Sequence, residues 1–160
     1  MNNGGAPLST LERELLETGI YASVTSGTSM QPLFRTHRDV VVLERPKGEI
    51  HRYDVVLYKA ADTGKYILHR VLRVRDNLYV VRGDNTYIKE YVPRGEILGV
   101  LVSFTRKGKK RTVKSFGYIL YSRLWCFIYP LRLSFVFLRR RVLSALSFIK
   151  RKLWGKGRNG

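Results

Sequence analysis

The stretch YILHRVLRV, residues 66–74, decides the fold class of this chain. Its residues are mostly β-branched, aliphatic or aromatic, and the turn-forming sequences ADTGK and RDN border it, which is typical of a β-strand. Five further runs of this kind lie between residues 20 and 105: IYASV, DVVVLE, YDVVLYK, LYVVRG and ILGVLVSF. These closely spaced strands predict a mainly β domain, built as a small sandwich or a barrel-like sheet.

A short helix is predicted before the first strand. In LSTLERELLET, residues 8–18, Ser9 and Glu12 fit a capping box, and Gly19 suits the end of a helix. Residues 1–28 contain neither the basic start nor the uninterrupted apolar stretch of a secretory signal peptide. We therefore expect three parts: an N-terminal helix in residues 1–19, a β domain in residues 20–105, and a tail in residues 106–160.

The positive charge of the chain is concentrated in the tail. The whole sequence carries a net charge of +18, yet residues 1–96 hold 14 Lys/Arg and 12 Asp/Glu, whereas residues 97–160 hold 16 Lys/Arg and no acid. Any attraction to the phosphates of lipid or nucleic acid is therefore a property of the last third of the chain. The single cysteine, Cys126, excludes an internal disulfide and has no histidine at metal-ligand spacing, so we expect neither a metal nor a cofactor.

The tail is predicted to associate with a membrane surface. TRKGKKRTVK, residues 105–114, has the composition of a solvated basic linker; residues 116–129 are apolar and aromatic, and residues 131–153 repeat apolar side chains at helical spacing. Arg123 and Arg132 argue against a membrane span, because a central arginine costs about 2.5–3.5 kcal/mol. We expect residues 116–154 to lie on an anionic membrane surface; the alternative is that the apolar stripe packs on the β domain.

One histidine stands out in the predicted strands. His37 and His51 lie in polar stretches, THRD and EIHRYD, where exposure is expected, whereas His69 lies inside the apolar strand YILHRVL. A serine nucleophile needs a base within hydrogen-bond reach, and SGTSMQPLF, residues 26–34, places Ser29 in a turn-prone stretch. From the residues alone, a turn at Ser29 and an unused histidine at position 69 remain the ordinary interpretation.

Four motifs together resemble type I signal peptidases, in particular the endoplasmic-reticulum and archaeal branch, which has His where the bacterial enzymes have Lys. They are GTSMQP, YDVVLY, LHRVL and RGDN, in the family's order and approximate spacing over residues 24–104. The resemblance implies a β peptidase fold shared with LexA-type repressors, in which Ser29 is the nucleophile and His69 the base. The function implied is cleavage of signal or leader peptides after small residues, with residues 20–105 as the catalytic domain. Lys65 is the nearest candidate for a lysine base, but four strand residues separate it from His69, about 13 Å.

The chain departs from the family pattern at several points. Gly27 replaces a serine that helps to stabilise the oxyanion in many members, so backbone N–H groups near Ser29 are left for that role, with Thr28 as a further candidate donor. The aspartate pair that follows GDN in the eukaryotic-like branch is replaced by TYIKEY. We prefer Asp84 as the residue that orients His69, with Glu90 as the alternative; a plain turn at GDN is the competing interpretation of Asp84.

Three function classes remain open at this point. In family members an N-terminal membrane span places the catalytic domain on the far side of the membrane. The predicted elements here include no such span, so we expect a membrane-associated enzyme on the cytoplasmic face. The second class is a LexA-like regulatory peptidase that cuts itself or a partner; the N-terminal helix is too short for a helix-turn-helix, and no nucleic-acid partner is expected. The third is a non-catalytic membrane or nucleic-acid binding module, which leaves the pairing of Ser29 with His69 unexplained.

Overall fold

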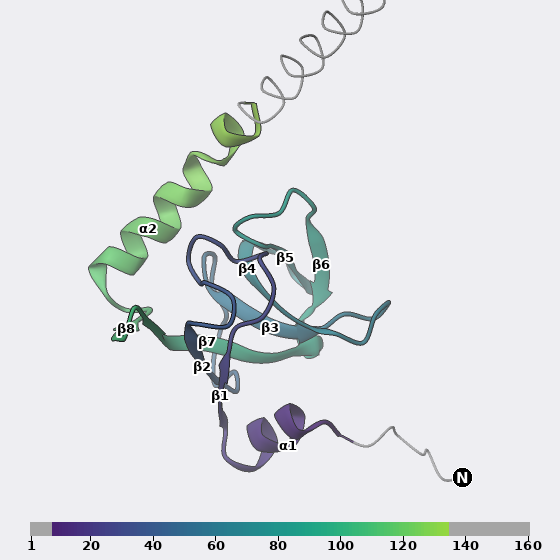
Figure 1. Cartoon of the computed structure of the whole chain (residues 1–160). Coiled ribbons are helices and arrows are strands. Elements are labelled where there is room, and N and C mark those ends of the chain that lie inside the picture. Colours follow the sequence, from purple (N-terminus) through teal and green to yellow (C-terminus); the bar gives the residue numbers. More distant parts are fainter. Residues whose placement is uncertain (1–7, 135–160) are drawn as a thin grey trace, which may run out of the picture. The chain divides into compact units, whose positions relative to one another are not determined.

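The computed structural model describes residues 8–134 of the chain. The chain divides into two compact units, and the boundary falls between Arg123 and Leu124. All strands belong to the first unit, where they form one curled, eight-stranded antiparallel sheet (Figure 1) in the order β1-β2-β7-β3-β4-β5-β6, with β8 paired to β7. The strands are β1 (Ile20–Val24), β2 (Val40–Glu44), β3 (Val55–Lys59), β4 (Tyr66–Val74), β5 (Leu78–Arg82), β6 (Glu90–Pro93), β7 (Ile97–Arg106) and β8 (Lys109–Thr112).

The mainly β fold predicted from the sequence is confirmed, and each of the six predicted runs contains a strand. Two strands, β6 and β8, lie outside these six runs. β6 lies after RGDN, in a stretch for which no strand was predicted, and β8 lies in the segment predicted to be a basic linker. This linker prediction is wrong, because Lys109–Thr112 pairs with β7 from Ser103 to Arg106 and closes a hairpin.

Helices flank the sheet. α1 (Thr10–Glu17) begins at Ser9 with the predicted capping box, since the Ser9 hydroxyl accepts from the Glu12 amide and the Glu12 carboxylate accepts from the Ser9 amide. A short 3-10 helix, η1 (Arg94–Glu96), precedes β7, and α2 (Phe116–Phe127) follows β8. Residues 129–134 are also helical. Most of the amphipathic helix predicted for residues 131–153 lies outside the described residues.

The buried side chains form two clusters on opposite faces of the sheet. β3 takes part in both, because Val55 and Leu57 belong to one cluster and Val56 and Tyr58 to the other. This alternation is what a strand buried on both faces requires. Among the described residues, no helix combines the length and the apolar character that crossing a membrane requires.

Candidate active site

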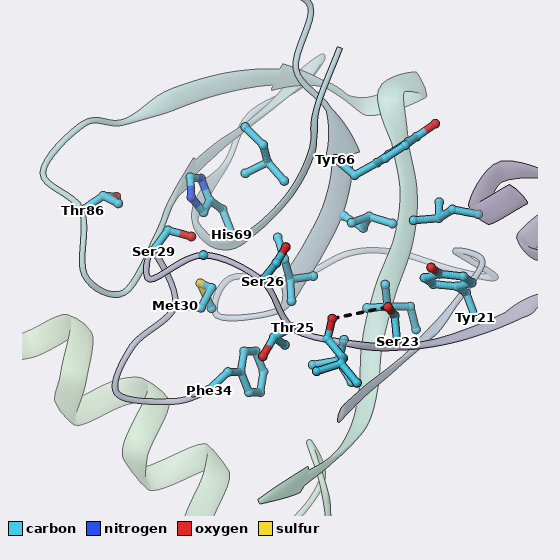
Figure 2. Close-up of a pocket in the computed structure, with 18 residues that line it drawn as sticks. Tyr21, Ser23, Thr25, Ser26, Ser29, Met30, Phe34, Tyr66, His69 and Thr86 are labelled. Carbon is cyan, nitrogen blue, oxygen red and sulfur yellow. Dashed lines mark hydrogen bonds between the residues drawn. The ribbon is translucent and has the colours of Figure 1, made fainter. Parts of the chain in front are cut away.

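A cleft of about 500 Å³ runs along the β domain and contains both Ser29 and His69 (Figure 2). Its walls are largely apolar, with Met30, Leu57 and Leu68 among the lining side chains. Two strand edges border it. In the described chain, β1 pairs with β2 alone, and residues 66–69 of β4 pair with β3 alone, because β5 joins β4 only from Arg70 onward. Unpaired backbone groups therefore face the cleft from both sides.

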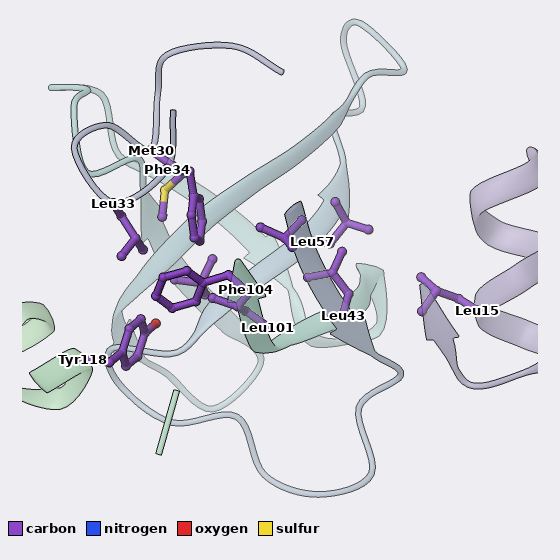
Figure 3. Close-up of a cluster of buried hydrophobic side chains, with 11 residues drawn as sticks. Leu15, Met30, Leu33, Phe34, Leu43, Leu57, Leu101, Phe104 and Tyr118 are labelled. Atoms are coloured by element: carbon purple, nitrogen blue, oxygen red, sulfur yellow. The ribbon is translucent and has the colours of Figure 1, made fainter. Parts of the chain in front are cut away.

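Ser29 lies in the loop that follows β1, and this loop is fastened to the core directly after it. Met30, Leu33 and Phe34 are 5%, 2% and 2% exposed, and the Phe34 ring meets Phe104 of β7 edge to face at a centroid distance of 5.3 Å (Figure 3). The Ser29 carbonyl oxygen accepts a hydrogen bond from the backbone N–H of Asn85 at 2.7 Å. The loop thus combines a buried anchor with a partly exposed serine, as a nucleophile position requires.

His69 lies on β4 opposite Val56 of β3 and is 4% exposed. Gly83 lies close to both His69 and Ser29. A Cβ built at position 83 would lie 2.6 Å from the Ser29 carbonyl oxygen, closer than real Cβ contacts allow, and 3.0 Å from His69 Nε2, which is a tight contact. Both residues therefore border the same backbone position, and any side chain there would displace the Ser29 backbone or the His69 ring. Glycine is the residue that fits between the Ser29 backbone and the imidazole.

The other imidazole nitrogen, Nδ1, faces a carboxylate and a phenol. Glu90 Oε1 lies 3.3 Å from His69 Nδ1, and the Tyr58 hydroxyl oxygen lies 3.1 Å from it. Tyr58 also donates its hydroxyl hydrogen to the second oxygen of Glu90. Because this hydrogen is committed to Glu90, His69 Nδ1 must be the donor in its own contacts. The neutral imidazole therefore carries its proton on Nδ1 and presents an unprotonated Nε2 toward Gly83 and Ser29.

Burial sets the basicity of this histidine. It lowers the pKa of His69 below the usual value of 6.5, while the charges of Glu90 and Asp84 oppose the shift. Burial and the neighbouring Glu90 carboxylate raise the pKa of Tyr58 far above its ordinary range, so its hydroxyl stays protonated. Near neutral pH the geometry thus provides a neutral imidazole whose tautomer is fixed from behind.

Asp84 has a different partner from the one preferred above. Its two carboxylate oxygens accept from Arg70 Nε and Nη2, both at 2.8 Å, and the pair is almost fully buried. The structure therefore assigns the contact with His69 to Glu90, the alternative left open, and makes Asp84 the counterion of Arg70. Arg70, the cation that Asp84 meets, directly follows His69 in the sequence.

The lysine and the two other histidines considered from the sequence do not line the cleft. Lys65 is exposed and is not among the residues that line the cleft, and His37 and His51 are exposed as expected. Gly27 lines the cleft with a φ of +80°, a backbone conformation that favours glycine.

Tyr58 was missed as a member of the site. Its signal was the hairpin register: Val56 lies opposite His69, so Tyr58 is the diagonal neighbour of His69 on the same face.

No protein-family model matches this chain, and comparison with the curated proteins gives no match either.

Proposed function

We propose that the chain is a serine endopeptidase of the signal-peptidase type, with Ser29 as nucleophile and His69 as base. The observation that carries the proposal is that Ser29 and His69 line the same cleft and both border Gly83, through the Ser29 carbonyl oxygen and His69 Nε2, while Glu90 and Tyr58 engage Nδ1. The motif resemblance supports the same two residues independently of this geometry. Glu90 takes the orienting place of the triad in this proposal.

The chemistry follows from the tautomer. His69 Nε2 takes the proton from the Ser29 hydroxyl as the oxygen attacks the scissile carbonyl carbon, and the imidazolium then gives that proton to the leaving amine. The Glu90 carboxylate stabilises the transient imidazolium charge, and water later releases the acyl group from Ser29. With Gly27 in place of a hydroxyl residue, backbone N–H groups beside Ser29 are the donors left for the oxyanion.

The cleft favours an extended peptide as the substrate. Its unpaired strand edges can hydrogen-bond the backbone of a peptide that lies between β1 and residues 66–69 of β4. The partly apolar lining suits uncharged side chains at the alternate positions that point inward. Cleavage after small residues remains a proposal that rests on the motif resemblance.

The assignment of His69 as the base predicts how the cleavage rate depends on pH. With a peptide that has small residues at the −1 and −3 positions, the rate should rise along a limb whose midpoint lies below pH 6.5, because neutral His69 is the active form and burial lowers its pKa. Glu90→Gln should move that limb to still lower pH, because the Glu90 charge raises the His69 pKa, and should reduce kcat about 10- to 100-fold. Rate profiles of both proteins measure these effects.

Glu49→Gln, at an exposed position in the β2–β3 connection, is the matched control and should leave the profile unchanged. A rate that rises only above pH 8 contradicts a histidine base and points to lysine. Mass spectrometry of the enzyme during the same assay separates the LexA-like alternative, because self-cleavage of the chain with no cleavage of the added peptide would favour that alternative.

We also propose that the enzyme works on an anionic membrane surface, as its charge distribution suggests. All four residues of β8 are exposed, three of them cationic, and residues 97–134 contain no acid. On α2, Phe116, Ile119 and Leu120 are 78%, 37% and 45% exposed. Exposed cations beside exposed apolar side chains match lipid headgroups above acyl chains, and anionic lipid is concentrated in the cytoplasmic leaflet.

Vesicle binding tests this proposal. The full chain should bind vesicles that contain phosphatidylserine, bind neutral vesicles weakly, and lose part of its binding in high salt, because only the charge contribution is screened. Lys109→Glu with Arg111→Glu should weaken binding to anionic vesicles about tenfold or more, at about 1 kcal/mol for each cation near the surface. Lys47→Glu, an exposed lysine of the β2–β3 connection, should have little effect. Equal binding to neutral and anionic vesicles would contradict the electrostatic part of the proposal.

A further inference from the structure

A buried ion pair lies directly behind the candidate active site. Arg70 and Asp84 are 0% and 3% exposed, and two parallel hydrogen bonds of 2.8 Å join them. Arg70 Nη1 donates further to the Tyr53 carbonyl oxygen at 2.9 Å. Each charge adjoins a residue of the site: Arg70 follows His69 on β4, and Asp84 follows Gly83. The pair therefore ties together the chain segments of His69 and Gly83, the glycine that both the Ser29 carbonyl oxygen and His69 Nε2 border.

α2 supplies the remaining partners of this ion pair. Arg70 Nη1 donates to Ser122 Oγ at 2.9 Å and to the Tyr118 hydroxyl at 3.3 Å, and the Tyr121 hydroxyl donates to Asp84 Oδ2 at 3.1 Å. Positions 118, 121 and 122 have the spacing of one helix face. Burial and the neighbouring Asp84 carboxylate raise the pKa of Tyr121, so this hydroxyl keeps the hydrogen that it donates.

These contacts give α2 a role that packing alone does not explain. A buried guanidinium is costly unless its donors are bonded, and Ser122, 1% exposed, and Tyr118, 9% exposed, cover one side of it. Without the three hydroxyls, Arg70 and Asp84 would lose partners and gain space to move. Because Gly83 adjoins Asp84 and leaves no room for even a Cβ beside Ser29 and His69, a small shift of the pair reaches the site directly.

We propose that Tyr118, Tyr121 and Ser122 of α2 are positioning residues, which hold Arg70 and Asp84 and through them the spacing between Ser29 and His69. This inference rests on the proposed peptidase function and deepens it. It makes α2 part of the machinery of the β domain rather than an attached tail. The face of α2 that carries Phe116 and Leu120 remains exposed, so one helix serves both the active site and the proposed membrane surface.

The test uses the full chain, a soluble peptide and no lipid, so that membrane binding cannot contribute. Tyr121→Phe and Ser122→Ala each remove one hydroxyl and keep the rest of the side chain, and we expect the double variant to lower kcat about tenfold with KM changed less than about twofold. Tyr91→Phe, at a tyrosine that is 63% exposed on β6, is the matched control and should equal the wild type.

A second measurement does not depend on activity. NMR titration of the His69 imidazole should give a higher pKa in the double variant than in the wild type, because water admitted behind the ring weakens the burial that lowers it. The groups that face His69 in this titration are Glu90 and Tyr58 at Nδ1, Ser29 and Gly83 at Nε2, and Asp84 at longer range. The acid limb of the rate profile should move by the same amount.

The outcomes separate the two proposals. An inactive wild type contradicts the peptidase function, and the His69 titration still decides the inference: an unchanged pKa overturns it and a raised pKa supports it. With an active wild type, a double variant whose kcat and His69 pKa equal those of the wild type overturns the inference. A loss of activity that disappears on cooling, with no shift of the acid limb, indicates a purely structural role and overturns it as well.

Discussion

Replacing Ser29 by alanine should abolish peptide cleavage, with a loss on the order of 10⁴-fold or more in kcat. The hydroxyl oxygen is the atom that attacks in the proposed mechanism. His69→Ala should have an effect of similar size, because the two residues act as one unit and their losses do not add. Steady-state cleavage of the peptide with small residues at −1 and −3 measures both variants.

The control for this experiment is Ser134→Ala, at an exposed serine whose hydroxyl donates to the Pro130 carbonyl within its own helical segment. This variant should cleave the peptide at the wild-type rate. Thermal melting should show that Ser29→Ala remains folded, because the Ser29 side chain is only partly buried. Full activity of Ser29→Ala would sink the assignment of the nucleophile, whatever His69→Ala does.

The largest expected effect on stability comes from Asp84. Asp84→Asn should lower the free energy of unfolding by about 3–5 kcal/mol, because it leaves the Arg70 charge buried without its counterion. Urea denaturation of the full chain measures the loss. Asp76→Asn makes the same chemical change at an exposed position in the β4–β5 turn and should change the free energy of unfolding by less than about 0.5 kcal/mol.

A double variant sharpens this prediction. Arg70→Met combined with Asp84→Leu removes both charges and should recover a large part of the stability, because apolar pairs of similar volume often replace buried ion pairs without loss. It should not recover activity, since Tyr121 and Ser122 then have no charged partners through which to act. A loss below about 1 kcal/mol for Asp84→Asn would mean that water screens the pair, contrary to its burial.

The strands that could be predicted are those whose own side chains mark them. The run of residues 66–74 is apolar enough to indicate a strand by itself, and β4 has the same bounds. Three of the four residues of β8 are Lys or Arg, which strand propensity does not favour. The strand exists because the turn at Lys107 and Gly108, both with positive φ, returns the chain to β7. β6 similarly depends on pairing with β5. Pairing is a property of the folded sheet, so a local pattern does not contain it.

The same distinction applies to the candidate site. Ser29 and His69 were predicted because each belongs to a short motif, and in the structure both line one cleft and border Gly83. The sequence prediction paired Asp84 with His69, whereas the structure pairs it with Arg70. A turn motif shows that a carboxylate is present but not which cation it meets. The hydroxyls of α2 were not considered at all. Their contact with Arg70 joins segments 52 residues apart for Ser122, and nothing in either segment marks the other.

The two unpaired strand edges that border the cleft have a consequence for the order of events in the cell. Only an extended backbone offers hydrogen-bonding groups to such edges; a helix has already used these groups internally, and a folded sheet has paired them with its own strands. A substrate protein would therefore be open to cleavage only until the region around the scissile bond folds. Under the proposed function, folding of the product would set the time available for processing and would protect the mature chain from a second cut.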